Sequence, residues 1–167
     1  TGNIPKGMDG TTYARIMEKC KNTITVVDAC GGLLTNTLKY KPFLIKPNIA
    51  ELEEIFGCDI ALKDVKTYAK KLQNMGAKNV LVSFGKDGAA LLCETGEYIT
   101  CPAPKGTLVN SVGSGDSMVA GFLCEYLKSG NYKESLRLAV AAGSASAFMP
   151  HLADKEAILR QKEQITV

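Results

Sequence analysis

Short apolar runs rich in β-branched residues alternate along this chain with longer segments whose apolar positions recur at helical spacing. The short runs predict strands, at residues 23–30, 42–47, 79–85, 89–94 and 97–103. The longer segments predict helices, at residues 9–21, 48–57, 64–75, 115–129, 132–148 and 154–163. Strands that alternate with helices in this order are typical of βα units around a mostly parallel sheet, so we expect an α/β fold.

The last two predicted strands are close enough in sequence to form a hairpin. Thr95 and Gly96 join them, so an antiparallel element is expected beside the parallel strands. The sequence shows no internal repeat, low-complexity tract or long linker. A length of 167 residues fits one domain better than two, and we therefore expect residues 1–167 to form a single domain.

The composition favours a folded domain whose partner is a small molecule. Hydrophobic residues make up 46% of the chain, the net charge is +3, and lysine and arginine form no basic block. A nucleic-acid partner is therefore not expected. Since no apolar run approaches the roughly 20 residues that span a bilayer, and no signal-peptide pattern is seen, a membrane partner is not expected either.

Six cysteines lie in apolar stretches of the sequence, without a CxxC pair that could begin a zinc or redox site. We expect them to be reduced core residues of a cytoplasmic protein. The chain opens at Thr1 in the loop-like segment TGNIPKGMDG. We therefore expect a fragment or processed product whose N-terminal part is absent.

The segment VNSVGSGDSMVAGFLCEYL, residues 109–127, carries the strongest chemical signal. Gly113, Ser114 and Gly115 are small, so the backbone N–H groups at the start of the following helix can approach an anion closely. Asp116 falls in the first helical turn, where the helix dipole favours the carboxylate that accepts a proton. The apolar residues that follow predict a helix buried on all sides, with Asp116 at a buried site. A phosphate cradle beside a carboxylate suits phosphoryl transfer.

Other interpretations of this part of the sequence are simpler or belong to other enzyme classes. The segment can be an ordinary capped turn, in which Ser114 or Asp116 caps the helix and the glycines serve the bend. GKDGAA at 85–90 does not supply the GxxxxGK of a P-loop, and Met118 stands where a Rossmann fingerprint needs a third small residue. A serine hydrolase needs GxSxG and a histidine partner, and the one histidine, His151, is expected to be structural.

NSVGSGDSMVAGF, at 110–122, resembles the second signature of the ribokinase-like, PfkB-type carbohydrate kinases, in the variant of the 1-phosphofructokinase and tagatose-6-phosphate kinase branch. Three further segments agree with the family in order. KPNIAEL at 46–52 is similar to its NxxE element, VSFGKDGA at 82–89 to its nucleotide loop, and TGNIPKG at the start to the segment beside its substrate site. Together these segments span nearly the whole chain.

The resemblance implies a three-layer α/β/α sandwich with a mostly parallel sheet, from which the family's N-terminal half and lid strands are missing. The chain would be the C-terminal nucleotide-binding and catalytic portion of a kinase domain. Two departures from the family pattern matter. Ser114 replaces a common alanine, which preserves the backbone cradle, whereas Asn110 and Ser111 stand in place of Asp-Thr, which casts doubt on a monovalent-cation site.

The resemblance also implies ATP and Mg²⁺ as cofactors. Contacts to ATP are expected at Lys46, Asn48, Ser83, Phe84, Gly85, Lys86, Asp87, Gly88 and Asn110. Glu51 is expected to hold water on Mg²⁺, whose octahedral shell usually keeps several waters. From the residues alone, Asn48 and Glu51 can equally begin a helix, 83–88 can be a strand-to-strand turn, and both Lys46 and Lys86 can be solvated surface lysines.

The activity that the resemblance implies is ATP-dependent phosphorylation of a sugar phosphate, with fructose 1-phosphate to fructose 1,6-bisphosphate as the leading reaction. Asp116 would take the proton from the acceptor hydroxyl, while the amides from Gly113 to Asp116 stabilise the charge on the phosphoryl group. Tagatose-6-phosphate kinase is the nearest alternative. A nucleotide-binding or regulatory module, or a fragment inactive on its own, is the alternative from another class. Because the family's lid contributes to dimerisation, a homodimer is expected of the full-length parent.

Overall fold

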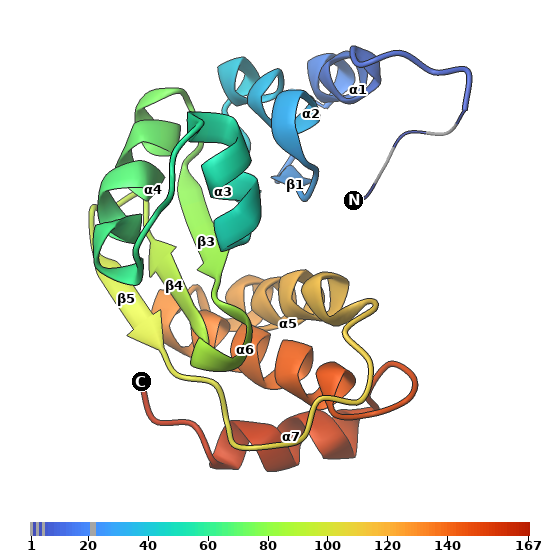
Figure 1. The fold of residues 1–167 in the computed structure, drawn as a ribbon, viewed down its shortest axis with the longest axis vertical. Coiled ribbons are helices and arrows are strands. Elements are labelled where there is room, and N and C mark those ends of the chain that lie inside the picture. The colour runs from blue at the N-terminus through green and yellow to red at the C-terminus, as the bar shows by residue number, and fades with distance from the viewer. Residues whose placement is uncertain (1, 3, 5, 21–22) are drawn as a thin grey trace. The chain divides into compact units, whose positions relative to one another are not determined.

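The computed structural model describes residues 2, 4, 6–20 and 23–167 of the chain. The chain divides into two compact units. Unit 1 comprises Thr1–Ser83 and Leu91–Tyr98, and unit 2 comprises Phe84–Ala90 and Ile99–Val167. Figure 1 follows the elements of both units in chain order, from blue at the N-terminus to red at the C-terminus.

Unit 1 contains short parallel strands, which are β1 (Val26–Val27), β2 (Leu44–Ile45) and β3 (Asn79–Ser83). Val26 of β1 pairs with Leu44, and Ile45 of β2 pairs with Val80. Leu44, Ile45 and Val80 are fully buried, as expected for parallel strands that are covered on both faces. The strands predicted here are confirmed in place, but the first two are shorter than expected because few of their residues meet a partner strand.

Helical segments flank these strands in the sequence of unit 1. They are α1 (Thr12–Lys19), α2 (Gly31–Thr35), α3 (Ile49–Phe56), α4 (Val65–Asn74) and the 3₁₀ turns η1 (Leu38–Tyr40) and η2 (Leu62–Asp64). The predicted helices at α1, α3 and α4 are confirmed, and Figure 1 shows α4 beside β3, which it contacts. We did not predict α2 and η1. Leu34 and Leu38 anchor them in the core, but Gly31 and Gly32 at the start of α2 lower its helix propensity.

Two further strands, β4 (Ala89–Leu92) and β5 (Tyr98–Cys101), complete a sheet whose order within the described residues is β1-β2-β3-β4-β5. The predicted hairpin between β4 and β5 is confirmed, since the N–H of Cys93 donates to the carbonyl of Glu97 at 2.9 Å across its turn. A second tight turn joins β3 to β4, where the N–H of Phe84 donates to the carbonyl of Gly88 at 2.7 Å. The sheet is therefore mixed: β1, β2 and β3 pair in parallel, and tight turns join β3 to β4 and β4 to β5.

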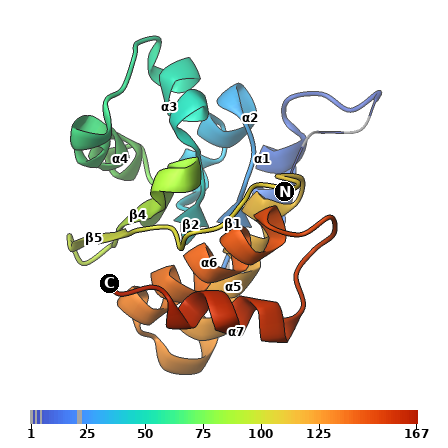
Figure 2. The ribbon, with the colours of Figure 1, turned by 60° about the horizontal axis from the view of Figure 1, so that its bottom comes forward.

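Unit 2 is dominated by α5 (Ser114–Ser129), α6 (Tyr132–Ala147) and α7 (Lys155–Glu163), which confirm the three helices predicted there. Helix α6 contacts both α5 and α7, and Figure 2 shows the three helices packed side by side. A Cβ added at Gly121 of α5 would lie 2.8 Å from the carbonyl oxygen of Leu138 in α6. The two helices therefore approach closely at that point. Arg137 ties α6 to α7 by donating to the carbonyl of Lys162 at 3.0 Å.

Two expectations about burial are wrong. Helix α5 is not buried on all sides, because Ala120, Cys124 and Leu127 are exposed, while Met118 and Phe122 face the core. The cysteines do not all lie in the core either. Among the six, all of which fall within the described residues and are free, Cys93 and Cys101 are buried, Cys20 is half-buried, and Cys30, Cys58 and Cys124 are exposed.

Burial of the two core thiols leaves them protonated. Desolvation raises the pKa of Cys93 and of Cys101 to about 12, because removal from water disfavours the thiolate. None of the helices in the described part of the chain is both long and apolar enough to cross a bilayer.

Candidate functional site

The turn before α5 begins at Gly113, which adopts a left-handed conformation with φ of 78°. A glycine meets this requirement without the steric cost that a Cβ would bring. Because Gly113 has no side chain, the N-cap position makes no side-chain hydrogen bond to the start of the helix. The hydroxyl of Ser114 turns back instead and donates to the carbonyl of Ser111 at 2.8 Å. The capped-turn interpretation that used Ser114 is therefore not what this turn shows.

The backbone of this turn offers donors to an anion. A helix leaves its first four N–H groups without acceptors inside the helix, and the positive end of its dipole favours negative charge there. Gly113, Ser114 and Gly115 are half-buried, and Gly113 and Gly115 bring no side chain over the amides. The turn therefore leaves backbone donors uncovered at the start of α5, and its role as a phosphate cradle stays a prediction.

Asp116 lies in the first turn of α5, as predicted. It is exposed rather than buried, so our expectation of a buried carboxylate is wrong. The reason is the one-sided burial of α5, whose apolar face does not include this position. An exposed carboxylate is accessible to a ligand, and the role of Asp116 as a general base stays a prediction.

The side chain of Asn110 makes two hydrogen bonds that fix the turn before α5. Its Oδ1 accepts the N–H of Val112 at 3.0 Å, and its Nδ2 donates to the carbonyl of Pro150 at 3.2 Å. Asn110 therefore links the turn to the segment that follows α6. Leu152 of the same segment lies over the N-cap, because a Cβ at Gly113 would come within 2.6 Å of Leu152 Cδ2.

A second group of predicted residues lies together in unit 1, around the start of α3. The N–H of Glu51 donates to Asn48 Oδ1, and the N–H of Asn48 donates to Glu51 Oε2, each at 2.9 Å. This capping box confirms that Asn48 and Glu51 begin the helix. Asn48 also pairs with Ser83 in a parallel bridge, and the N–H of Ser83 donates to the carbonyl of Pro47 at 3.1 Å. Unit 1 thus brings together Asn48, Glu51 and Ser83 from two predicted motifs.

Lys46 is not a solvated surface lysine, since only 5% of it is exposed. Its Nζ lies 3.3 Å from Asp28 Oδ1. A buried lysine needs such a partner because an isolated buried charge is costly. Sequence reasoning missed Asp28, although an acidic residue at the end of the apolar run VVDA was a usable signal. The carbonyl of Asp28 also accepts the N–H of Gly2 at 2.9 Å, whereas Thr1, Asn3 and Pro5 of the predicted substrate segment lie outside the described residues.

Glu51 can serve Mg²⁺ only as a partner of a hydrated ion. Its Oε1 accepts the thiol of Cys30 at 3.2 Å, and its Oε2 accepts the N–H of Asn48. Each oxygen keeps a lone pair that can accept a metal-bound water. The described residues contain no group of three or more histidine, cysteine, aspartate or glutamate side chains arranged around a metal position. This donor set fits Mg²⁺, which retains waters and substrate oxygens, rather than a cage of protein ligands.

The contact with Glu51 should make Cys30 slow to alkylate although it is exposed. The hydrogen bond to Glu51, together with the partial desolvation of the thiol, raises the pKa of Cys30 to about 11. Because the thiolate is the reactive form, a rise of about two units lowers its fraction at pH 8 by about 100-fold. Replacing Glu51 by glutamine removes the charge but keeps the length of the side chain. We expect Glu51→Gln to speed iodoacetamide labelling of Cys30 by about 10-fold or more.

The labelling is measured by peptide mass spectrometry, with exposed Cys124 in the same sample as the internal reference. Cys124 lies in unit 2 and should react at the same rate in both proteins. Equal labelling of Cys30 in the wild type and in Glu51→Gln would contradict the hydrogen bond as the cause of the raised pKa.

The predicted nucleotide loop is a tight turn that lies mostly in unit 2. Gly85–Asp87 forms a 3₁₀ turn, η3, between Phe84 and Gly88. Gly85, Lys86 and Asp87 are exposed, whereas Gly88 is buried. The strand-to-strand interpretation of this segment is therefore confirmed, and its exposed part remains accessible to a ligand. The predicted contacts of this loop, of Lys46, of Asn48 and of Asn110 with ATP stay predictions.

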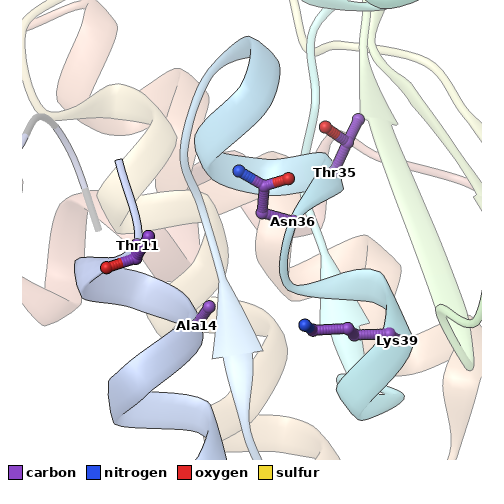
Figure 3. A pocket seen from close by; sticks show the side chains of 5 residues that line it. All are labelled: Thr11, Ala14, Thr35, Asn36 and Lys39. Atoms are coloured by element: carbon purple, nitrogen blue, oxygen red, sulfur yellow. The ribbon is translucent and has the colours of Figure 1, made fainter. Parts of the chain in front are cut away.

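A separate hollow of about 340 Å³ lies in unit 1. Figure 3 shows its lining, with Thr11 just before α1, Ala14 on α1, and Thr35, Asn36 and Lys39 opposite them. Three of these side chains are exposed, and none belongs to the predicted site.

Comparison with known proteins gives a consistent result. A model described as pfkB family carbohydrate kinase matches residues 2–154. The chain is 42% identical over 169 residues to 1-phosphofructokinase from Bacillus subtilis, covering 99% of this chain and 55% of that protein. It is 34% identical to D-tagatose-1-phosphate kinase from Bacillus licheniformis, covering all of this chain and 56% of that protein.

The likeness extends to three-dimensional structure. The crystal structure of phosphofructokinase-2 from Escherichia coli, in complex with substrates and products, superposes with a TM-score of 0.88 at 28% identity. The matched region covers 98% of this chain and 55% of that one. This chain therefore spans about half the length of the proteins that it resembles.

Proposed function

This chain belongs to the pfkB family of carbohydrate kinases, and from that premise we propose that it carries the phosphate cradle and the catalytic base of an ATP-dependent sugar-phosphate kinase. The family and the ribokinase-like fold class predicted from the sequence are thereby confirmed. The observation that carries the proposal is the start of α5, where an open glycine N-cap precedes Asp116 by three residues. Amide donors and a carboxylate in one helical turn are what phosphoryl transfer requires.

In the proposed mechanism, Asp116 accepts the proton of the acceptor hydroxyl as the hydroxyl oxygen attacks the transferred phosphorus. The amides from Gly113 to Asp116 stabilise the negative charge on the phosphoryl oxygens, and the dipole of α5 adds to that stabilisation. Glu51 would hold Mg²⁺ through water, which its remaining lone pairs can accept. ATP supplies the phosphoryl group and leaves as ADP, and Mg²⁺ would neutralise charge on the phosphate oxygens.

Fructose 1-phosphate is the acceptor that we propose, with phosphorylation at its 6-hydroxyl. The likeness to the Bacillus subtilis 1-phosphofructokinase supports this choice. The second candidate is tagatose 1-phosphate, because the next relative described above is a D-tagatose-1-phosphate kinase. Tagatose 6-phosphate, our alternative from the sequence, stays a third possibility to be assayed.

The experiment that tests this proposal compares initial rates with ATP and Mg²⁺ on fructose 1-phosphate, fructose 6-phosphate, tagatose 1-phosphate and tagatose 6-phosphate. The whole protein and the 167-residue chain are assayed in parallel. We expect the whole protein to have its highest kcat/KM with fructose 1-phosphate. Because the chain spans only about half of its relatives, we expect it to be inactive by itself. A whole protein that phosphorylates none of the four would favour a nucleotide-binding module instead.

A further inference from the structure

A pair of hydroxyls joins the first turn of α5 to the end of α6. Ser117 Oγ lies 2.8 Å from Ser146 Oγ, and only 2% of Ser146 is exposed. Ser146 Oγ also accepts the N–H of Ala153 at 3.2 Å. A serine hydroxyl has one proton and two lone pairs, so Ser146 can hold both partners at once. One buried hydroxyl thus bonds to the residue after Asp116 and to the segment that follows α6.

Segment 149–154 contacts the turn before α5 at two other points. Its Pro150 carbonyl accepts from Asn110 Nδ2, and its Leu152 lies against Gly113. It ends at Asp154, which caps α7 by accepting the N–H of Ala157 at 2.8 Å. The segment is therefore held at Pro150, Leu152 and Asp154, and Ser146 adds a contact at Ala153, just before the cap of α7.

The backbone contact between α5 and α6 sets their separation but not the direction of the first turn. A Cβ at Gly143 of α6 would lie 3.1 Å from the carbonyl oxygen of Ser114. The two backbones are therefore close at this point, and close packing limits further approach while it leaves rotation about the helix axis less restricted. A hydrogen bond is directional, so the bond between Ser117 and Ser146 restrains that rotation. Rotation of this turn would change where the Asp116 carboxylate points.

We propose that Ser146 is a positioning residue for Asp116, because its hydroxyl fixes the first turn of α5 against segment 149–154. The proposal rests on the proposed function, in which Asp116 is the base. A catalytic group must be held within about 0.5 Å of its productive position, and small displacements cost much of the rate. Ser146 does not touch the substrate in this account; it acts through Ser117.

The test in the whole protein is Ser146→Ala, with Ser135→Ala as the matched control. Ser135 is also a buried serine of α6, but its hydroxyl donates to Asn131 of its own helix start at 2.6 Å. We expect Ser146→Ala to lower kcat by about 10-fold while KM for both substrates changes by less than about two-fold, since the loss falls on the transition state. Ser135→Ala should lose similar stability and keep kcat within about two-fold of the wild type.

A double-mutant cycle shows whether the two hydroxyls act together. Ser117→Ala should reproduce the loss in kcat, and the double variant should be no slower than either single variant, because residues that act as one unit are not additive. Additive losses would overturn the role of the pair.

Amide hydrogen exchange of the same proteins gives a readout that does not depend on activity. Ser146→Ala should speed exchange at Ala153 and in the first turn of α5, and Ser135→Ala should speed it only near the start of α6. Unchanged exchange at both places, or equal losses of kcat in the two alanine variants, would overturn the positioning role. A wild-type protein without transfer activity would instead overturn the proposed function, and the exchange data would still decide whether Ser146 holds the turn.

Discussion

Replacing Asp116 by asparagine should lower kcat of the whole protein by about 10² to 10⁴, the usual contribution of a general base. Asparagine keeps the shape of the side chain and cannot accept the proton of the acceptor hydroxyl. The binding of ATP should change little, because the cradle donors are backbone amides of the turn rather than this side chain. The measurement is a steady-state assay that gives kcat and KM separately for ATP and for the sugar phosphate.

Glu156→Gln is the matched control for this substitution. Glu156 is also an exposed acidic residue in the first turn of a helix, α7, but it belongs to no predicted site. Both variants lose a negative charge that favours a helix N-terminus, so their melting temperatures should fall by similar small amounts. The account is contradicted if Asp116→Asn keeps the turnover of Glu156→Gln.

Gly88→Ala should cost about 3 kcal/mol or more in the free energy of unfolding, because it combines backbone strain with a collision in a packed region. Gly88 has φ of 100° and ψ of −136°, a conformation that residues with a Cβ rarely adopt. The added Cβ would lie 2.1 Å from the carbonyl oxygen of Cys101 and 2.7 Å from the nitrogen of Ala103. Since both neighbours are backbone atoms, no side-chain rotation relieves the contact.

Gly85→Ala in the same loop separates strain from collision. Gly85 has φ of 59°, and a Cβ there would meet nothing within 4 Å. The expected loss is about 1 kcal/mol, the cost of a left-handed conformation alone. Urea unfolding of the two variants gives both values. Similar midpoints for Gly85→Ala and Gly88→Ala would show that the packing of Gly88 against residues 101–103 is not as tight as described.

Local sequence signals predicted the local structure around the candidate site residues. The glycine turn before Asp116 and the capping box of Asn48 and Glu51 each lie within a few residues, and the structure has both where the spacing placed them. Helix propensity and periodicity act over the same short range. The elements whose patterns are strong, such as α6, were accordingly located to within about one residue at each end.

Contacts between distant residues could not be predicted in this way. The ion pair of Lys46 with Asp28 and the hydroxyl pair of Ser117 with Ser146 join positions far apart in sequence. Nothing in either segment alone specifies the partner. The exposure of Asp116 was missed for a related reason. An apolar composition indicates that α5 has a buried face, but tertiary packing decides how wide that face is.

The central claim is that this chain supplies the base and cradle for phosphoryl transfer to a sugar phosphate. The most direct test is ³¹P NMR of the reaction mixture of the whole protein with ATP, Mg²⁺ and fructose 1-phosphate, beside the same mixture with Asp116→Asn. The account predicts that the wild type converts ATP and fructose 1-phosphate to ADP and fructose 1,6-bisphosphate, and that Asp116→Asn forms little of either product. Release of inorganic phosphate without a bisphosphate, or equal conversion by both proteins, would contradict it.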